Sequence, residues 1–228
     1  LVQDALAAHY LQNAKSAAEV CCQTPGPLSE VMQGAYRELN SNLKLKVSEK
    51  LLPLFSEDLL PLSDLFLCIA ETRLKYARQK FLRASPQKAM QERVALEQAL
   101  YQASIAFQRC GDLASALLLA SQDEKHAGIL AKFNPSLFED NWAAALNNYA
   151  NCLSENGQSK ESLEMMKKSL GICERLAQNE PETFEGAWAG ALRNYALRLN
   201  EIGQIGESLS MAKDSLRLYE RLMKDKPE

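Results

Sequence analysis

Side chains capable of acid–base, nucleophilic or metal chemistry are few and scattered in this sequence. The two histidines, His9 and His126, are far apart and lie in no nucleophile or metal-binding motif. The six cysteines show neither CxxC nor metal-ligand spacing, so we interpret them as reduced and mostly buried. Glycine-rich phosphate loops are absent. The sequence therefore predicts a protein that is not an enzyme and that uses no cofactor or metal.

Amide and guanidinium side chains gather instead on one stripe of two predicted helices. An asparagine amide can bond a peptide's carbonyl and N–H together, and an arginine can hold a carboxylate. Asn148 and Asn194 occupy the same position in two consecutive repeats. They are therefore expected to lie about one repeat apart and to contact an extended ligand at two points along its length. The alternative is that these amides bridge adjacent helix pairs. The predicted partner-binding residues are Asn147, Asn148, Asn151, Arg193, Asn194 and Asn200.

The elements that position these residues are duplicated. Shifting the chain by 46 residues superposes residues 135–180 on 181–226 with 24 identical positions, where chance gives about three. A degenerate earlier copy, residues 89–134, keeps Gly111 in phase with Gly157. We therefore predict repeats near 89–134, 135–180 and 181–228. They form an all-α, right-handed superhelical stack of antiparallel helix pairs.

Each repeat shows the apolar period of two helices separated by a glycine. Gly157 and Gly203 suit the left-handed residue that ends a helix, and Pro181 is expected to stop the helix before it. The predicted pairs are 139–155/159–178 and 185–201/205–224. We expect Ser159 to cap the second helix of its pair. The buried face of the first helix is expected to carry Trp142, Leu146, Tyr149, Ala150 and Leu153.

These residues carry a family resemblance. The order of large and small residues in 146–170 resembles the tetratricopeptide repeat, although this unit is longer than the usual length of about 34 residues. The run Leu146-Asn147-Asn148-Tyr149-Ala150 resembles long variants in kinesin light chains and large regulatory ATPases. The resemblance implies a non-catalytic scaffold that binds a peptide or protein in a concave groove formed by the first helices.

Composition and charge exclude two classes of partner. The 29 acidic and 26 basic residues leave a net charge of -3, which excludes a globally basic nucleic-acid binder. Apolar runs stay short of the roughly 18 residues that span a bilayer. The sequence predicts a cytoplasmic protein that binds neither nucleic acid nor membrane. Its partners would be other proteins, peptides or other domains of its own chain.

Residues 1–88 lack the 46-residue period and are predicted to form an N-terminal helical cap. An alternative rests on residues 1–11, which resemble the H-x-L-V-x-D helix near the end of the ATPase module in signal-transducing ATPases with repeat tails. Under that alternative the array is the sensor or autoinhibitory arm of a larger regulator. Pro227 is in phase with the earlier repeat starts, so we expect the natural array to continue past Glu228.

Overall fold

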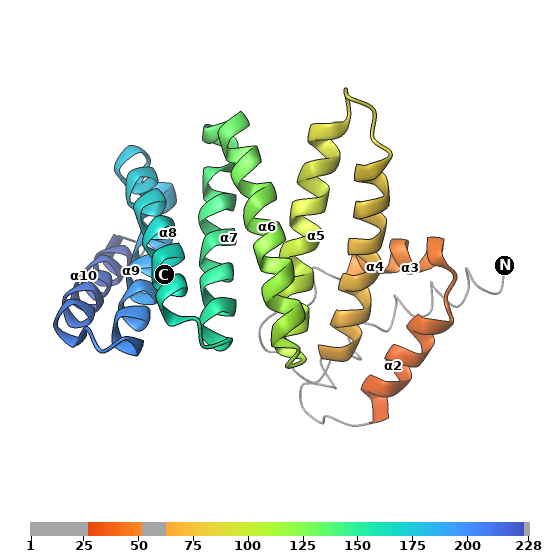
Figure 1. Ribbon diagram of the computed structural model, residues 1–228, viewed down its shortest axis with the longest axis horizontal. Helices are drawn as coiled ribbons and strands as arrows, with labels where there is room; N and C mark the ends of the chain where they lie inside the picture. The colour runs from red at the N-terminus through yellow and green to blue at the C-terminus, as the bar shows by residue number, and fades with distance from the viewer. Residues whose placement is uncertain (1–26, 52–62, 226–228) are drawn as a thin grey trace. The chain divides into compact units, whose positions relative to one another are not determined.

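The computed structural model describes residues 27–51 and 63–225, and every regular element in these ranges is an α-helix (Figure 1). Residues 1–11, which resemble a helix near the end of an ATPase module, and the residues after 225 lie outside the described residues. Contacts divide the chain into two compact units, with the boundary between Ala116 and Leu117. The expected division into a cap and an array at residue 88 stays a prediction.

The N-terminal unit contains four described helices and the start of a fifth. They are α2 (Pro27–Glu38), α3 (Ser41–Leu51), α4 (Ser63–Leu82), α5 (Ala89–Arg109) and the first residues of α6 (Leu113–Phe133). α4 packs against α5, and α2 and α3 both pack against α4. The interior is mainly apolar, with Tyr36, Val47 and Ile69 each almost fully buried, although Glu97 is buried as well.

The C-terminal unit contains the rest of α6 and four helices that pack in chain order. They are α7 (Pro135–Glu155), α8 (Ser159–Asn179), α9 (Pro181–Glu201) and α10 (Ile205–Asp225). α7 packs on α8, α8 on α9 and α9 on α10 (Figure 1). We call α7 and α9 first helices, and α8 and α10 second helices. The predicted helix pairs are confirmed, and the extra length of the repeat lies in the helices, which have 21 residues each.

The helix starts differ from the prediction by about four residues. Pro135 and Pro181 each begin a first helix, whereas the sequence reading placed them before it. Proline suits the first helical position because it has no N–H to leave unpaired there and its φ is already helical. Ser159 is likewise the first residue of α8, after Gln158, and no side-chain hydrogen bond caps this helix. The expected Ser159 cap was therefore wrong.

The glycines that end the first helices have the predicted left-handed conformation. Gly157 has a φ of 77° and Gly203 a φ of 80°, and Gly111 of the degenerate copy also has a φ of 80°. The Gly157 N–H bonds the Ser154 carbonyl at 2.8 Å, and the next N–H reaches back to Leu153 at 2.9 Å. This is the Schellman pattern, and it recurs at Gly111 and Gly203. Three copies of one helix ending support the third repeat.

Candidate binding surface

The six predicted binding residues lie on the two first helices. Asn147, Asn148 and Asn151 belong to α7, and Arg193, Asn194 and Asn200 belong to α9. These two helices contact each other directly. The fold therefore brings the two parts of the predicted site together on neighbouring elements.

Asn148 does not lie where the sequence reading placed it. Its side chain is buried, with 5% of the residue exposed, whereas Asn194 at the matching position is half-buried. The burial of Asn148 counts against its predicted direct contact with an extended ligand.

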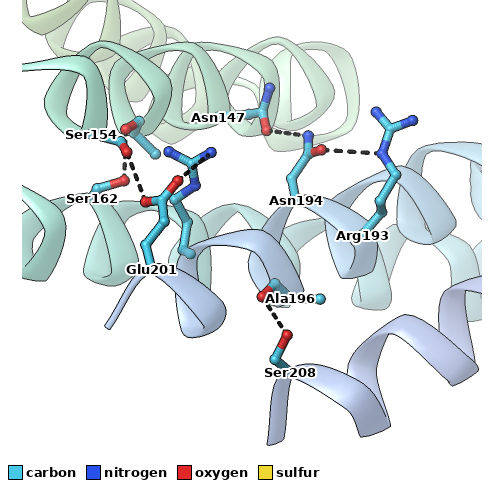
Figure 2. A network of polar contacts seen from close by, with 10 residues as sticks. Asn147, Ser154, Ser162, Arg193, Asn194, Ala196, Glu201 and Ser208 are labelled. Carbon is cyan, nitrogen blue, oxygen red and sulfur yellow. Dashed lines mark hydrogen bonds and ion pairs between the residues drawn. The ribbon is translucent and has the colours of Figure 1, made fainter. Parts of the chain in front are cut away.

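Asn194 bridges the two first helices. Its Nδ2 donates a hydrogen bond of 2.8 Å to Oδ1 of Asn147, and its own Oδ1 accepts a bond of 3.4 Å from Nε of Arg193 (Figure 2). The sequence reading had left open whether these amides bind a ligand or bridge adjacent repeats. The structure shows the bridge for Asn147 and Asn194. Asn147 and Asn194 are 47 residues apart, one more than the repeat length, so the bond does not join equivalent positions of the two repeats.

A second polar link joins the same helices nearer their C-terminal ends. Ser154 Oγ donates a hydrogen bond of 2.7 Å to Glu201, whose other carboxylate oxygen pairs with Arg198 at 3.1 Å (Figure 2). The sequence reading did not select Arg198 or Glu201. The spacing along the sequence could have indicated this pair, because Glu201 follows Ser154 by 47 residues, as Asn194 follows Asn147.

An accessible surface remains between and beside these two links. Arg193 and Asn200 are exposed, and Asn151 is half-buried. Leu197 is 50% exposed at the position that Asn151 occupies in the preceding repeat. We call the set formed by Asn151, Arg193, Leu197 and Asn200 the first-helix surface.

A hollow of about 200 Å³ adjoins this surface beside the amide bridge. Asn147 and Asn194 line it, together with the small residues Ala144, Ala187 and Gly190. The rest of the lining is mostly apolar and includes Leu176 and Phe184, so the two amides lie at the edge of a largely apolar hollow.

The described cysteines are free thiols; Cys68, Cys152 and Cys173 lie in helices, and Cys110 follows the end of α5. Burial, with a smaller contribution from the nearby Glu155 carboxylate, raises the pKa of Cys152 to about 12. Burial also raises the pKa of Cys173. A thiol with a raised pKa is a poor nucleophile at neutral pH because it stays protonated. These two cysteines are therefore packing residues, as the sequence reading predicted for the cysteines as a group.

Within residues 27–51 and 63–225, histidines, cysteines and carboxylates form no group that could hold a metal ion. None of the helices in those ranges combines the length and the apolar character of a membrane span.

The comparisons with known proteins agree with the geometry. The model of the tetratricopeptide repeat matches residues 142–181. No curated protein matches the chain. Among solved structures, a kinesin-light-chain-like protein of Podosopora anserina with nearly identical TPR-like repeats is 16% identical. It has a TM-score of 0.59 over 97% of this chain and 95% of its own.

A second solved structure, BtubC (BKLC) from P. vanneervenii, is 12% identical with a TM-score of 0.50. The alignment covers 100% of this chain and 95% of that chain. At these identities the similarity concerns the fold alone.

Proposed function

We propose that this chain, in which residues 142–181 match the tetratricopeptide repeat, is a non-catalytic scaffold that binds a peptide or protein segment along its first helices. Repeat arrays present preformed surfaces, and proteins that contain this repeat commonly bind other proteins. The observation that carries the proposal is the first-helix surface, where a cation, two amides and a leucine remain accessible although the helices beneath are already packed.

The roles within this surface follow from chemistry. The Arg193 guanidinium offers a carboxylate a charged hydrogen bond, and its long contact with Asn194 leaves its terminal nitrogens available. Asn151 and Asn200 supply amides for a peptide backbone. Leu197 gives an apolar anchor between them. In this proposal Asn147 and Asn194 hold the two helices at the spacing that the ligand requires, and the protein works in the cytoplasm.

A displayed library of random peptides tests this function. Peptides are selected on the full chain, and their affinity is then measured for an Arg193→Ala, Asn200→Ala variant. Losing a charged and a neutral hydrogen bond, at about 1.5–3 and 0.5–1.5 kcal/mol, should weaken binding at least tenfold. The matched control is Lys167→Ala, Lys168→Ala, because both lysines are exposed on α8 away from this surface.

Two results would contradict the proposal. One is failure to enrich any peptide that binds the folded chain. The other is that every enriched peptide binds the Arg193→Ala, Asn200→Ala variant as tightly as it binds the parent chain. Circular dichroism of both variants checks that the fold is intact.

A further inference from the structure

The two tryptophans of the duplicated repeats occupy equivalent positions and have different surroundings. Trp142 of α7 donates a hydrogen bond of 3.1 Å from its indole nitrogen to the Glu124 carboxylate of α6. The same indole lies against Gly128 of α6, where an added Cβ would come within 3.2 Å of the indole nitrogen. Two features of α6 therefore hold Trp142: the Glu124 carboxylate and the close approach that Gly128 allows.

Trp188 of α9 lacks both of these partners. The positions 46 residues after Glu124 and Gly128 are Leu170 and Glu174 of α8. Leucine provides no acceptor, and Glu174 has a Cβ where Gly128 allows close approach. Among the residues that the structure describes, none accepts a hydrogen bond from the Trp188 indole. The duplication has kept the tryptophan and lost its carboxylate.

An open hollow borders Trp188. Its volume is about 500 Å³, within the usual range of ligand pockets. α8 and α10 form its walls and α9 its floor, where Trp188 and Leu192 lie. The lining is mainly apolar, and the other apolar residues are Leu170, Met211 and Leu218. We call this hollow the second-helix pocket.

The rim of the second-helix pocket carries two arginines with different roles. Arg221 pairs with Glu185 at 2.5 Å, as Arg175 pairs with Glu139 at 2.7 Å one repeat earlier, so this ion pair belongs to the repeat itself. Arg217 replaces Gly171 of the preceding copy. Its side chain is 76% exposed, and its only described ion pair is with Asp214 on the same helix at 3.2 Å. Such an exposed pair is weak, so Arg217 can exchange it for another carboxylate.

We propose that the second-helix pocket binds a segment of a partner protein that presents one large apolar side chain beside one carboxylate. The apolar side chain fills the space between Leu170, Leu192 and Leu218. The carboxylate pairs with Arg217 and accepts a hydrogen bond from the Trp188 indole N–H. The ligand's carboxylate thus takes the place that Glu124 has beside Trp142. This site lies on the second helices and is independent of the first-helix surface.

The rim charges limit how acidic the ligand can be. Arg217 and Arg221 face Glu174 and Asp214 around the same opening, so the rim is neutral as a whole. A segment with several acidic residues would meet Glu174 and Asp214 and be repelled. The pocket therefore selects a single acidic residue next to the apolar anchor.

A selection experiment tests the proposal separately from the proposed function. A displayed random-peptide library is selected on the full chain carrying Arg193→Ala and Asn200→Ala, which disables the first-helix surface, and is counter-selected on the same chain with Arg217→Glu added. We expect enriched peptides that pair a large apolar residue with one acidic residue. Their affinity should fall at least tenfold with Arg217→Glu and stay unchanged with Lys213→Glu, an exposed residue of α10 outside the pocket lining.

Fluorescence supplies a direct readout of the pocket. In a Trp142→Phe chain, Trp188 is the sole tryptophan, so peptide binding should change its emission. A Leu170→Glu variant places a carboxylate at the register of Glu124 and should reduce peptide affinity, whereas Leu170→Gln should reduce it less. If Leu170→Glu does not fold, the Arg217→Glu comparison still decides. The proposal is overturned if no peptide is enriched, if the enriched peptides lack an acidic residue, or if Trp188 emission does not respond to them.

Discussion

The repeats 135–180 and 181–226 share their interior contacts and differ where their side chains meet solvent. In both, a serine of the second helix donates to a first-helix carbonyl twelve residues earlier: Ser162 to Ala150 at 2.6 Å and Ser208 to Ala196 at 2.8 Å. A second serine does the same over 26 residues, Ser169 to Ala143 at 2.8 Å and Ser215 to Ala189 at 2.7 Å. These bonds join the two helices of each pair.

The surroundings of the repeats diverge. Trp142 is held by Glu124, whereas Trp188 faces an open pocket. Position 151 is an asparagine, and its equivalent, Leu197, is an exposed leucine. Both copies keep the serine bonds, the left-handed glycine and the ion pair, while several residues that face a neighbouring helix or solvent differ. Binding residues should therefore be sought among the differences between the copies.

The largest expected contrast comes from truncating the matched core leucines. Leu146→Ala should destabilise the chain by about 2–5 kcal/mol because the side chain is fully buried among packed neighbours. Leu192→Ala should cost less, because Leu192 borders the second-helix pocket and is slightly more exposed than Leu146. Urea unfolding followed by circular dichroism measures both. Equal losses would show that the second-helix pocket is filled in solution.

Replacing the glycines that end the first helices should destabilise both copies by similar amounts. Gly157→Val and Gly203→Val should each cost about 1–2 kcal/mol, because an L side chain is strained at positive φ. Open space surrounds both positions, so the two costs should be nearly equal. Gly171→Ala is the control: it lies inside α8 with open space around it and should stabilise the chain. Thermal melts compare all three, and unchanged melts for both valine variants would refute the conformational argument.

Removing the serine hydroxyls should affect both copies alike. Ser169→Ala and Ser215→Ala should each destabilise by about 1 kcal/mol, since each serine is buried and loses one hydrogen bond to a carbonyl. Ser208→Ala should cost less than Ser162→Ala, because Ser208 is only half-buried. The free energies of unfolding from urea titrations test this order. A negligible effect of Ser169→Ala would mean that small size alone, and not the bond, is required at this position.

The smallest effect concerns Cys152, whose equivalent in the next copy is Arg198. With its pKa raised to about 12 by burial, the folded state holds the thiol proton more tightly than the unfolded chain, for which the reference value is 9.0. The stability that this difference contributes is complete below pH 9 and is lost as the pH rises toward 12. Thermal midpoints between pH 8 and 11 should fall less for Cys152→Ala than for the parent chain. Identical slopes would contradict the raised pKa.

Much of the fold could be predicted because its signals are local or repeated. Gly157 and Gly203 mark helix ends because left-handed backbone favours glycine. Pro135 and Pro181 were misread because proline both ends one helix and suits the first position of the next, and only the backbone distinguishes these uses.

The candidate site could be predicted only in part, since its pairings depend on how neighbouring helices are offset. Asn194 bonds Asn147 and not its own equivalent, Asn148, so a comparison of equivalent positions does not reveal this pair. Trp142 and Trp188 are identical in sequence position, and the sequence predicted a packing role for both. Their environments differ because of Glu124 and Leu170, which belong to the helix before each tryptophan.

The two links between α7 and α9 also have a mechanical consequence. Asn147 and Ser154 are seven residues apart, which is about 10 Å along a helix, so the links to α9 act at two heights on the same seam. A motion that separates α7 from α9 along their whole length must stretch both links. A tilt of α9 that pivots at one link stretches only the second link. Each bond is partly accessible to water, which can replace it at little cost. The two links therefore fix the register of α7 against α9, and either can open without disturbing the packing of both helices on α8.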